Sequence, residues 1–347
     1  MRFGRLGPSG SVVLEEREPP IAGPGELTVD LAACGVCGTD LEKVRGNYRT
    51  AGILGHEPVG RLATVGDGVA GLRVGDRVFV HHHVPCGSCD VCRRGDTTFC
   101  PSYSRTNLDP GGFADRFRVS SEHVRQGAVL PLAASVDWPT GALLEPAACA
   151  LTALRKVGLP PGAKVLVLGL GPVGLLYARL ARALGADWVG GTELSELRRR
   201  AAERGGIDVA LDPREPAALQ EAVRAATGGQ GVDLAVAASG HPSVVRTAVE
   251  QVRRGGTVNL FGLPEADSRL DVDLQQLYLR GIRLVPSYAT TEPEIREVHA
   301  LVVDGRLRLD DLVSHRLPLA EIAEAFRLAG RPADALKVVV TGPAFGG

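Results

Sequence analysis

The chain has 347 residues, more than one ordinary core accommodates, and this length predicts two domains. With 44% hydrophobic residues, 23% charged residues and no apolar run long enough to span a membrane, its composition is that of a soluble globular protein. A formal net charge of -1 argues against nucleic acid or an anionic membrane as a partner, and the N-terminus lacks the apolar core of a signal peptide, so we expect a cytoplasmic protein.

The first 145 residues contain short apolar segments separated by Gly, Pro and Asp, for example 26–33, 60–65 and 76–81. This spacing predicts a β-rich, partly open barrel. The three consecutive histidines His81, His82 and His83 begin at the last residue of one of these segments. Strand alternation would turn His82 away from its two neighbours, so we expect them to be structural or to line a cleft rather than to bind metal.

Four of the seven cysteines are closely spaced as C-x2-C-x2-C-x7-C, at Cys86, Cys89, Cys92 and Cys100. In a cytosolic chain such a cluster indicates metal ligands more often than disulfides. Four thiolates complete the tetrahedral shell of zinc and leave no open position, which is typical of a structural site. An iron–sulfur cluster is the chemical alternative, although the spacing matches neither of its usual patterns.

A second group of possible ligands is dispersed along the first domain and consists of Cys37, His56, Glu57 and Glu145. A thiolate, an imidazole and a carboxylate can hold a zinc ion that keeps one position open for water or substrate. Each residue alone also fits an ordinary structural role, such as a buried histidine or a small buried thiol. The spacing by itself leaves both interpretations open.

From about residue 146 strands and helices alternate, which predicts a doubly wound parallel sheet. The expected strands are 165–168, 188–192, 207–211, 234–238, 257–261 and 282–286, and the expected helices between them include 172–184, 217–226 and 242–252. Helices at 293–303 and 319–328 and a strand at 337–341 follow. Residues 287–347 are too few for an independent core, so we expect them to pack against the first domain.

The first strand of this region runs into a dinucleotide-binding motif. Gly169, Gly171 and Gly174 form G-x-G-x-x-G, and Pro172 and Val173 begin the helix whose N-terminus would face a pyrophosphate.

Two residues bear on which dinucleotide is bound. Glu193 lies about 20 residues beyond the last glycine, where a carboxylate accepts from the ribose hydroxyls and disfavours a 2′-phosphate. Arg198 follows in a run of three arginines that is normally solvated but can reach such a phosphate. The sequence therefore favours NAD over NADP.

Taken in order, these motifs resemble a zinc-dependent medium-chain dehydrogenase/reductase of the alcohol dehydrogenase superfamily. The resemblance is carried by Gly35-x-Cys-x-Thr-Asp40, Gly55-His-Glu-x-x-Gly60, the four-cysteine segment, the glycine motif, and the stretches from Ser314 and Lys337. It implies a GroES-like catalytic domain (1–145) with a structural zinc lobe at about 84–102, a Rossmann domain (146–286), and a return to the catalytic domain (287–347). It also implies a homo-oligomer, a tetramer or a dimer.

The resemblance also implies roles for the dispersed residues. Cys37, His56 and Glu145 would ligate the catalytic zinc, with glutamate at the third position as in polyol, threonine and glucose dehydrogenases. Glu57 would lie beside the metal, either replacing Glu145 or supporting the ligands.

The residues around Cys37 would orient a ligand and move the proton. Asp40 would orient His56, and Thr39 would bind the substrate oxygen and take its proton. Glu42 stands where many relatives have a histidine that completes the proton path.

These roles together predict two zinc ions per chain and NAD-linked oxidation of a secondary alcohol of the polyol, sugar or cyclitol class. Two alternatives remain at this stage. One is a threonine-type amino-alcohol dehydrogenase, and the other is a non-catalytic zinc-containing protein that senses a dinucleotide.

Overall fold

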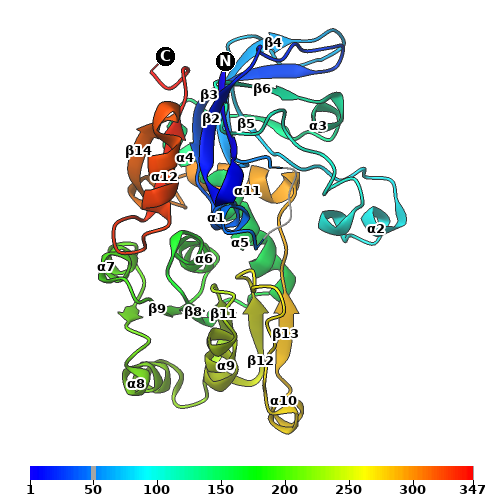
Figure 1. The fold of residues 1–347 in the computed structure, drawn as a ribbon. Helices are drawn as coiled ribbons and strands as arrows, with labels where there is room; N and C mark the ends of the chain where they lie inside the picture. The colour runs from blue at the N-terminus through cyan, green and yellow to red at the C-terminus, as the bar shows by residue number, and fades with distance from the viewer. Residues whose placement is uncertain (48–51, 347) are drawn as a thin grey trace.

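The computed structural model describes residues 1–47 and 52–346. Figure 1 shows two parts, one above the other, with both chain termini in the upper part and a parallel sheet in the lower part. Among the described residues, no helix has the length and hydrophobicity needed to cross a membrane.

The upper part is built on a seven-stranded sheet in the order β14-β15-β3-β4-β5-β7, with β6 paired to β3. Its strands are β3 (Leu27–Gly35), β4 (Pro58–Val65), β5 (Arg77–Val80), β6 (Arg116–Val119), β7 (Val129–Pro131), β14 (Val313–Pro318) and β15 (Lys337–Thr341). A separate hairpin is formed by β1 (Arg2–Leu6) and β2 (Val12–Glu16). The short helices are α1 (Gly38–Val44), α2 (Asp90–Arg93), α3 (Ser121–Arg125), α4 (Trp138–Gly141) and α12 (Ile322–Ala329), with 3-10 turns at Pro8–Gly10, Thr97–Phe99, Asp310–Leu312 and Leu319–Glu321.

The lower part is a six-stranded parallel sheet in the order β10-β9-β8-β11-β12-β13. Its strands are β8 (Lys164–Leu168), β9 (Trp188–Thr192), β10 (Val209–Leu211), β11 (Val232–Ala237), β12 (Val252–Leu260) and β13 (Arg283–Pro286). Its helices are α6 (Pro172–Ala183), α7 (Glu196–Arg204), α8 (Pro216–Thr227), α9 (Pro242–Gln251) and α10 (Leu274–Arg280). In chain order this is the 3-2-1-4-5-6 arrangement of the Rossmann fold. The predicted fold class is confirmed.

Alternating side chains of the parallel strands bury the sheet on both faces. Val165 and Val167 of β8 belong to one large core cluster, while Leu166 and Leu168 point into another. Helices α5 (Leu144–Val157) and α6 cover the first face, and α8 and α9 cover the second. This two-sided burial explains why β8 is an uninterrupted apolar run.

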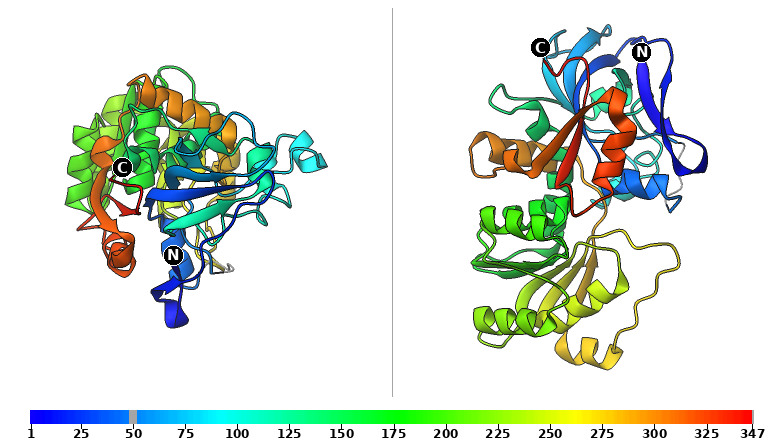
Figure 2. Two further views of the ribbon diagram at one scale, coloured as in Figure 1. Left: turned by 90° about the horizontal axis from the view of Figure 1, so that it is seen from above. Right: turned by 60° about the vertical axis from the view of Figure 1, so that its left-hand side comes forward.

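The C-terminal residues lie in the sheet of the upper part. Strand β15 pairs antiparallel with β3, with Val339 opposite Gly35. Helix α11 (Glu292–Val303) packs against α5. In the right view of Figure 2, α11 is the orange helix above the parallel sheet. Residues distant in sequence are thereby brought to the segment that carries Cys37.

The alternation predicted for His81, His82 and His83 was wrong, although the apolar segment 76–81 does contain a strand. Strand β5 ends at Val80, so the histidines that follow are not part of a regular strand. The His82 ring lies beside those of both neighbours, with centroids 5.3 Å from His81 and 4.1 Å from His83. Alternation therefore does not separate them.

Candidate active site

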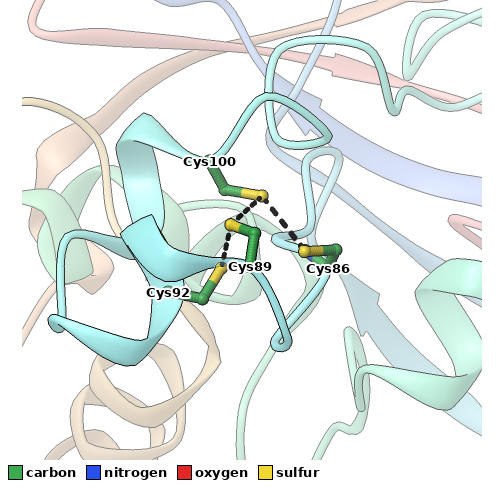
Figure 3. A group of neighbouring side chains, drawn as sticks. All are labelled: Cys86, Cys89, Cys92 and Cys100. Atoms are coloured by element: carbon green, nitrogen blue, oxygen red, sulfur yellow. Dashed lines mark hydrogen bonds between the residues drawn. The ribbon is translucent and has the colours of Figure 1, made fainter.

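The four cysteines of the protruding lobe around α2 converge on one point (Figure 3). The sulfur of Cys89 lies 3.5 Å from that of Cys92 and 3.8 Å from that of Cys100, which is 3.6 Å from the sulfur of Cys86. A tetrahedral zinc with Zn–S bonds of about 2.3 Å separates its sulfurs by about 3.8 Å. Hydrogen bonds from the Ser88 backbone and hydroxyl lower the pKa of Cys86 to about 6, which favours the ligating thiolate. The residues fit a structural zinc.

A second set of donors lies at the end of β3 and the start of β4. The donor atoms of Cys37, His56 and Glu57 all lie within 4.8 Å of one another. Cys37 precedes α1, and His56 and Glu57 immediately precede β4, which pairs with β3. A soft thiolate, an imidazole and a carboxylate are a donor set that zinc accepts while keeping an open position. These residues therefore fit a catalytic zinc as well.

Asp40 is fully buried on α1 beneath this set. Its Oδ2 lies 3.4 Å from His56 Nδ1, and its Oδ1 accepts the backbone N–H of Gly55 at 3.2 Å. Burial would raise the pKa of Asp40, but the charge and hydrogen bond of His56 outweigh it, with help from Lys43 and Gly55, and lower the pKa to about 2. Asp40 is thus an anion that holds one ring nitrogen of His56 and leaves the other for a metal.

Glu57 is also fully buried and faces a cation from the far end of the chain. Lys337 Nζ, at the start of β15, lies 2.8 Å from Glu57 Oε1 and 2.6 Å from Oε2. Burial raises the pKa of Glu57, against the charges of Lys337 and His56. Burial would lower the pKa of Lys337. The charge of Glu57 outweighs this effect, so the pKa of Lys337 is raised. The sequence motifs did not identify this ion pair.

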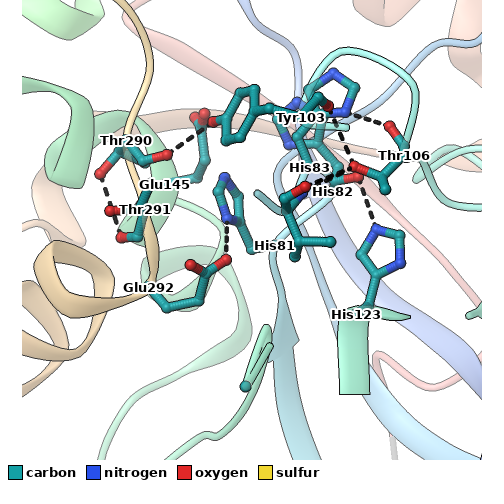
Figure 4. Close-up of polar contacts among 12 residues, drawn as sticks. His81, His82, His83, Tyr103, Thr106, His123, Glu145, Thr290, Thr291 and Glu292 are labelled. Atoms are coloured by element: carbon teal, nitrogen blue, oxygen red, sulfur yellow. Dashed lines mark hydrogen bonds and ion pairs between the residues drawn. The ribbon is translucent and has the colours of Figure 1, made fainter. Parts of the chain in front are cut away.

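Glu145, at the start of α5, lies with two of the consecutive histidines. Its donor atoms are within 4.8 Å of those of His81 and His82, and Figure 4 shows the three side chains together. His81 is fully buried, and its Nδ1 lies 2.9 Å from Glu292 Oε1 on α11. The ring of His82 is 5.0 Å, centroid to centroid, from that of His56, so the two donor sets are adjacent.

Burial also favours the uncharged forms of three groups in this region, His82, His83 and Cys149. Burial and then the neighbouring histidines lower the pKa of His82 well below its usual value, and burial lowers that of His83 to about 3. Cys149 is half-buried, and its Sγ lies 3.5 Å from Glu145 Oε1. Burial and Glu145 raise the pKa of Cys149 well above its usual value, so its thiol is a poor nucleophile.

The two residues expected to move the proton are both on α1. Thr39 Oγ1 lies 3.8 Å from Cys37 Sγ, beside the first donor set. Glu42 accepts hydrogen bonds from Arg45 Nη1 at 2.6 Å and Asn47 Nδ2 at 2.7 Å. The Glu42 carboxylate is therefore hydrogen-bonded to two residues that follow it closely in the chain. Its role in proton transfer stays a prediction.

The glycine motif forms the turn between β8 and α6. Gly169 has a φ of +103°, which favours glycine, and a Cβ at Gly174 would lie 1.9 Å from the carbonyl oxygen of Gly169. Gly171 is the N-cap of α6, with Pro172 and Val173 in the first turn. The turn has the geometry that lets a pyrophosphate approach the helix N-terminus.

Glu193 follows β9 at the same edge of the sheet, where its Oε1 accepts the backbone N–H of Ser195 at 3.0 Å. Arg198 is buried, and its Nη1 would lie 3.4 Å from a Cβ at Gly171. Its Nε donates to Ala335 O at 3.3 Å, so its side chain bridges the two parts of the molecule. Arg198 thus lies beside the glycine turn, while Arg200 forms an exposed ion pair with Glu196.

Metal binding beside Asp40 is expected to depend on pH. Burial opposes protonation of His56, but the charges of Asp40 and Cys37 outweigh it and raise its pKa well above the usual value. Zinc must then displace a proton, so its affinity should rise at least about tenfold per pH unit while His56 is protonated. Competition with a chromogenic chelator between about pH 6 and pH 8 measures this. In Asp40→Asn the dependence should weaken, and an affinity independent of pH in the unaltered protein would contradict the assignment.

Two family models cover most of the chain. Residues 23–129 match the alcohol dehydrogenase GroES-like domain, and residues 172–304 match the zinc-binding dehydrogenase domain. A sorbitol dehydrogenase of Bacillus subtilis (strain 168) is 31% identical over 95% of this chain and 94% of its own. The chain belongs to the zinc-binding dehydrogenase family. It is accordingly an oxidoreductase enzyme with the medium-chain dehydrogenase fold.

Other members of the family differ in what their names say they act on. An L-threonine 3-dehydrogenase of Pyrococcus abyssi is 32% identical, with 92% of each chain covered. A structure from Sinorhizobium meliloti 1021, described as a zinc-binding dehydrogenase bound to NADP, is 28% identical, covers 98% of both chains and has a TM-score of 0.85. Membership of the zinc-binding dehydrogenases therefore does not identify the substrate or decide between NAD and NADP. Both depend on this chain's own residues.

Proposed function

We propose that this zinc-binding dehydrogenase oxidises a secondary alcohol of the polyol, sugar or cyclitol class to its ketone. The observation that carries the proposal is the juxtaposition of Cys37, His56 and the buried carboxylate of Glu57, whose donor atoms all lie within 4.8 Å of one another. The glutamate at position 145 and the sorbitol dehydrogenase relative both favour a polyol.

Each residue then has a stated task. Cys37, His56 and Glu145 hold the catalytic zinc, with Glu57 as the alternative carboxylate, and Asp40 fixes the His56 ring. When bound, zinc supplies the Lewis acid that lowers the pKa of the substrate hydroxyl, and the nicotinamide supplies the hydride acceptor. Thr39 takes the hydroxyl proton and passes it outward.

NAD is the proposed cofactor, with a second, structural zinc in the four-cysteine lobe. The Gly169–Gly174 turn binds the pyrophosphate, and Glu193 accepts from the ribose hydroxyls and disfavours a 2′-phosphate. Arg198 lies close enough to the turn to pair with a phosphate of the cofactor.

We also propose that the enzyme acts in the cytoplasm as a homo-oligomer, a dimer or a tetramer. Exposed apolar side chains on α10 support this assembly, with Leu274 76% exposed and Tyr278 86% exposed beside the edge strand β13. Apolar side chains that gather on one exposed face commonly mark a protein interface.

Initial rates with polyols, sugars, aminocyclitols and L-threonine, each with NAD and with NADP, test the function. We expect the highest kcat/KM with a polyol or cyclitol and NAD. The threonine dehydrogenase relative keeps an amino-alcohol substrate as the second candidate, and a preference for L-threonine would establish it. Binding of NADH without turnover of any alcohol would instead indicate a dinucleotide sensor.

Replacing Glu145 by alanine is expected to abolish turnover while NADH binding, followed by fluorescence, remains nearly unchanged. The reason is that the carboxylate lies at the start of α5, whereas the proposed dinucleotide-binding turn precedes α6. Glu57→Ala provides the matched comparison. Turnover that survives Glu145→Ala but not Glu57→Ala would assign the third ligand to Glu57.

A further inference from the structure

We propose that a basic cavity in the upper part of the molecule binds a phosphate monoester. The cavity has a volume of about 480 Å³, and it is formed by residues of β4, β5, α4 and β14 (Figure 1). Its lining includes Arg61, Arg77, Asp137, Trp138, Arg316 and Phe345. These residues are distinct from the metal-binding groups and from the glycine turn. The proposed alcohol oxidation gives the cavity no role, so this inference goes beyond that function.

The lining of this cavity has an excess of positive charge. Three arginines face one aspartate, which leaves a net charge of +2. Arg61 and Arg77 are direct cross-strand partners on β4 and β5, where like charges destabilise a sheet. Burial and then the charge of Arg61 lower the pKa of Arg77, against the opposing effect of Asp137. Asp30, the partner of Arg61 on β3, is itself paired with Arg116. A bound dianion would therefore relieve the repulsion between the two arginines.

A buried indole holds two of the guanidinium groups in place. Trp138 is 8% exposed, and the guanidinium carbons of Arg77 and Arg61 lie 4.1 Å and 5.4 Å from the centroid of its ring. The Nη1 and Nη2 atoms of Arg77 also donate to three carbonyl oxygens of the segment 133–136. Positive charge fixed in this way is preorganised, so an anion that binds here does not have to order these side chains.

Arg316 adds a third guanidinium from β14. It is exposed, and within residues 1–47 and 52–346 its side chain forms no hydrogen bond or ion pair. Its planar fork of N–H donors suits the oxygens of a phosphate group. A phosphate monoester carries a charge of about -1.5 to -2 near pH 7, which matches the net charge of the cavity better than one carboxylate does. The half-buried ring of Phe345 offers an apolar surface to the organic part of such a ligand.

Titration of the zinc-loaded full-length protein with phenyl phosphate tests the proposal. The chain has two tryptophans, so Trp188→Phe leaves Trp138 as the fluorescent reporter at the cavity. At constant ionic strength we expect a saturable change in the Trp138 emission that is complete below about 10 mM. Phenol, the uncharged analogue, should produce no saturable change. Calorimetry on the protein that retains Trp188 provides a second measurement of the same binding.

Variants locate the binding site. Arg316→Gln should weaken phenyl phosphate binding about tenfold or more, because a charge-assisted hydrogen bond is lost. The matched control is Arg73→Gln, which removes the same charge from an exposed position between β4 and β5, outside the cavity lining, and should leave the affinity unchanged.

Three results would overturn the proposal. The first is the absence of a saturable response to phenyl phosphate, or an equal response to phenol. The second is an unchanged affinity in Arg316→Gln, which would place the ligand elsewhere, for example at the glycine turn. The third is an equal loss in Arg73→Gln, which would indicate non-specific attraction to positive charge. None of these readouts depends on alcohol turnover, so failure here is distinguishable from failure of the proposed function.

Discussion

Replacing Lys337 by methionine is expected to lower the free energy of unfolding by about 3–5 kcal/mol, the usual cost of leaving one partner of a buried ion pair uncompensated. Glu57 is 0% exposed, the side chain of Lys337 is 2% exposed, and their charged atoms approach to 2.6 Å. Without the ammonium group, Glu57 must either stay charged in a buried site or take up a proton. Both outcomes cost free energy in the folded state only.

Urea unfolding of the zinc-loaded protein measures the effect through the shift of the midpoint at constant slope. Lys164→Met is the matched control, because Lys164 pairs with Asp187 at 3.5 Å while their side chains are 31% and 64% exposed. An exposed pair of this kind contributes about 0–1 kcal/mol. If Lys337→Met lowered the free energy of unfolding by no more than Lys164→Met does, the buried pair would contribute no more to stability than an exposed one, and the prediction would be contradicted.

A double substitution separates loss of the pair from loss of the lysine itself. Glu57→Gln combined with Lys337→Met removes both charges and should be less destabilised than the sum of the two single variants. Strict additivity would mean that the two side chains do not stabilise each other. The double variant also shows whether Lys337 acts on the metal through Glu57, because any effect on zinc affinity should then vanish once Glu57 is neutral.

Local sequence patterns were sufficient to predict the fold class. The apolar run of β8, the glycines at 169–174 and the alternation that follows are set by neighbours within a few residues, and the sheet has the expected Rossmann order. The cysteines of the lobe are likewise close in sequence, so their spacing alone predicted that they would converge. Interactions between residues that are close in sequence determine such features, so a single sequence is enough to predict them.

The partners that complete the site were not predictable in this way. Lys337 lies 280 residues from Glu57, and Glu292 lies 211 residues from His81. These contacts exist only because β15 joins the first sheet and α11 packs on α5. One signal was present, since Lys337 is one of only four lysines and begins an otherwise apolar strand, where a charge needs a partner. The alternation expected of His81, His82 and His83 is not observed, because strand β5 ends at Val80, before all three histidines.

Replacing Cys37 by alanine is expected to lower kcat/KM for alcohol oxidation by about 10³-fold or more. Loss of one of three ligands removes several kcal/mol of charge stabilisation that the metal supplies in the transition state, and each 1.36 kcal/mol is about tenfold in rate. NADH affinity should change little, because the glycine turn and Glu193 belong to the other part of the molecule.

The matched control is Cys34→Ala, which alters another cysteine three residues earlier in the chain. Cys34 is fully buried on β3, and its Sγ contacts the Gly35 carbonyl oxygen at 3.8 Å, outside the metal-binding groups. It should keep the zinc content and the turnover, with at most a modest loss of stability from the small cavity. Zinc content, NADH fluorescence and initial rates of both variants form one set of measurements. Full turnover by Cys37→Ala, or equal losses in the two variants, would contradict the assignment of Cys37 as a ligand of the catalytic metal.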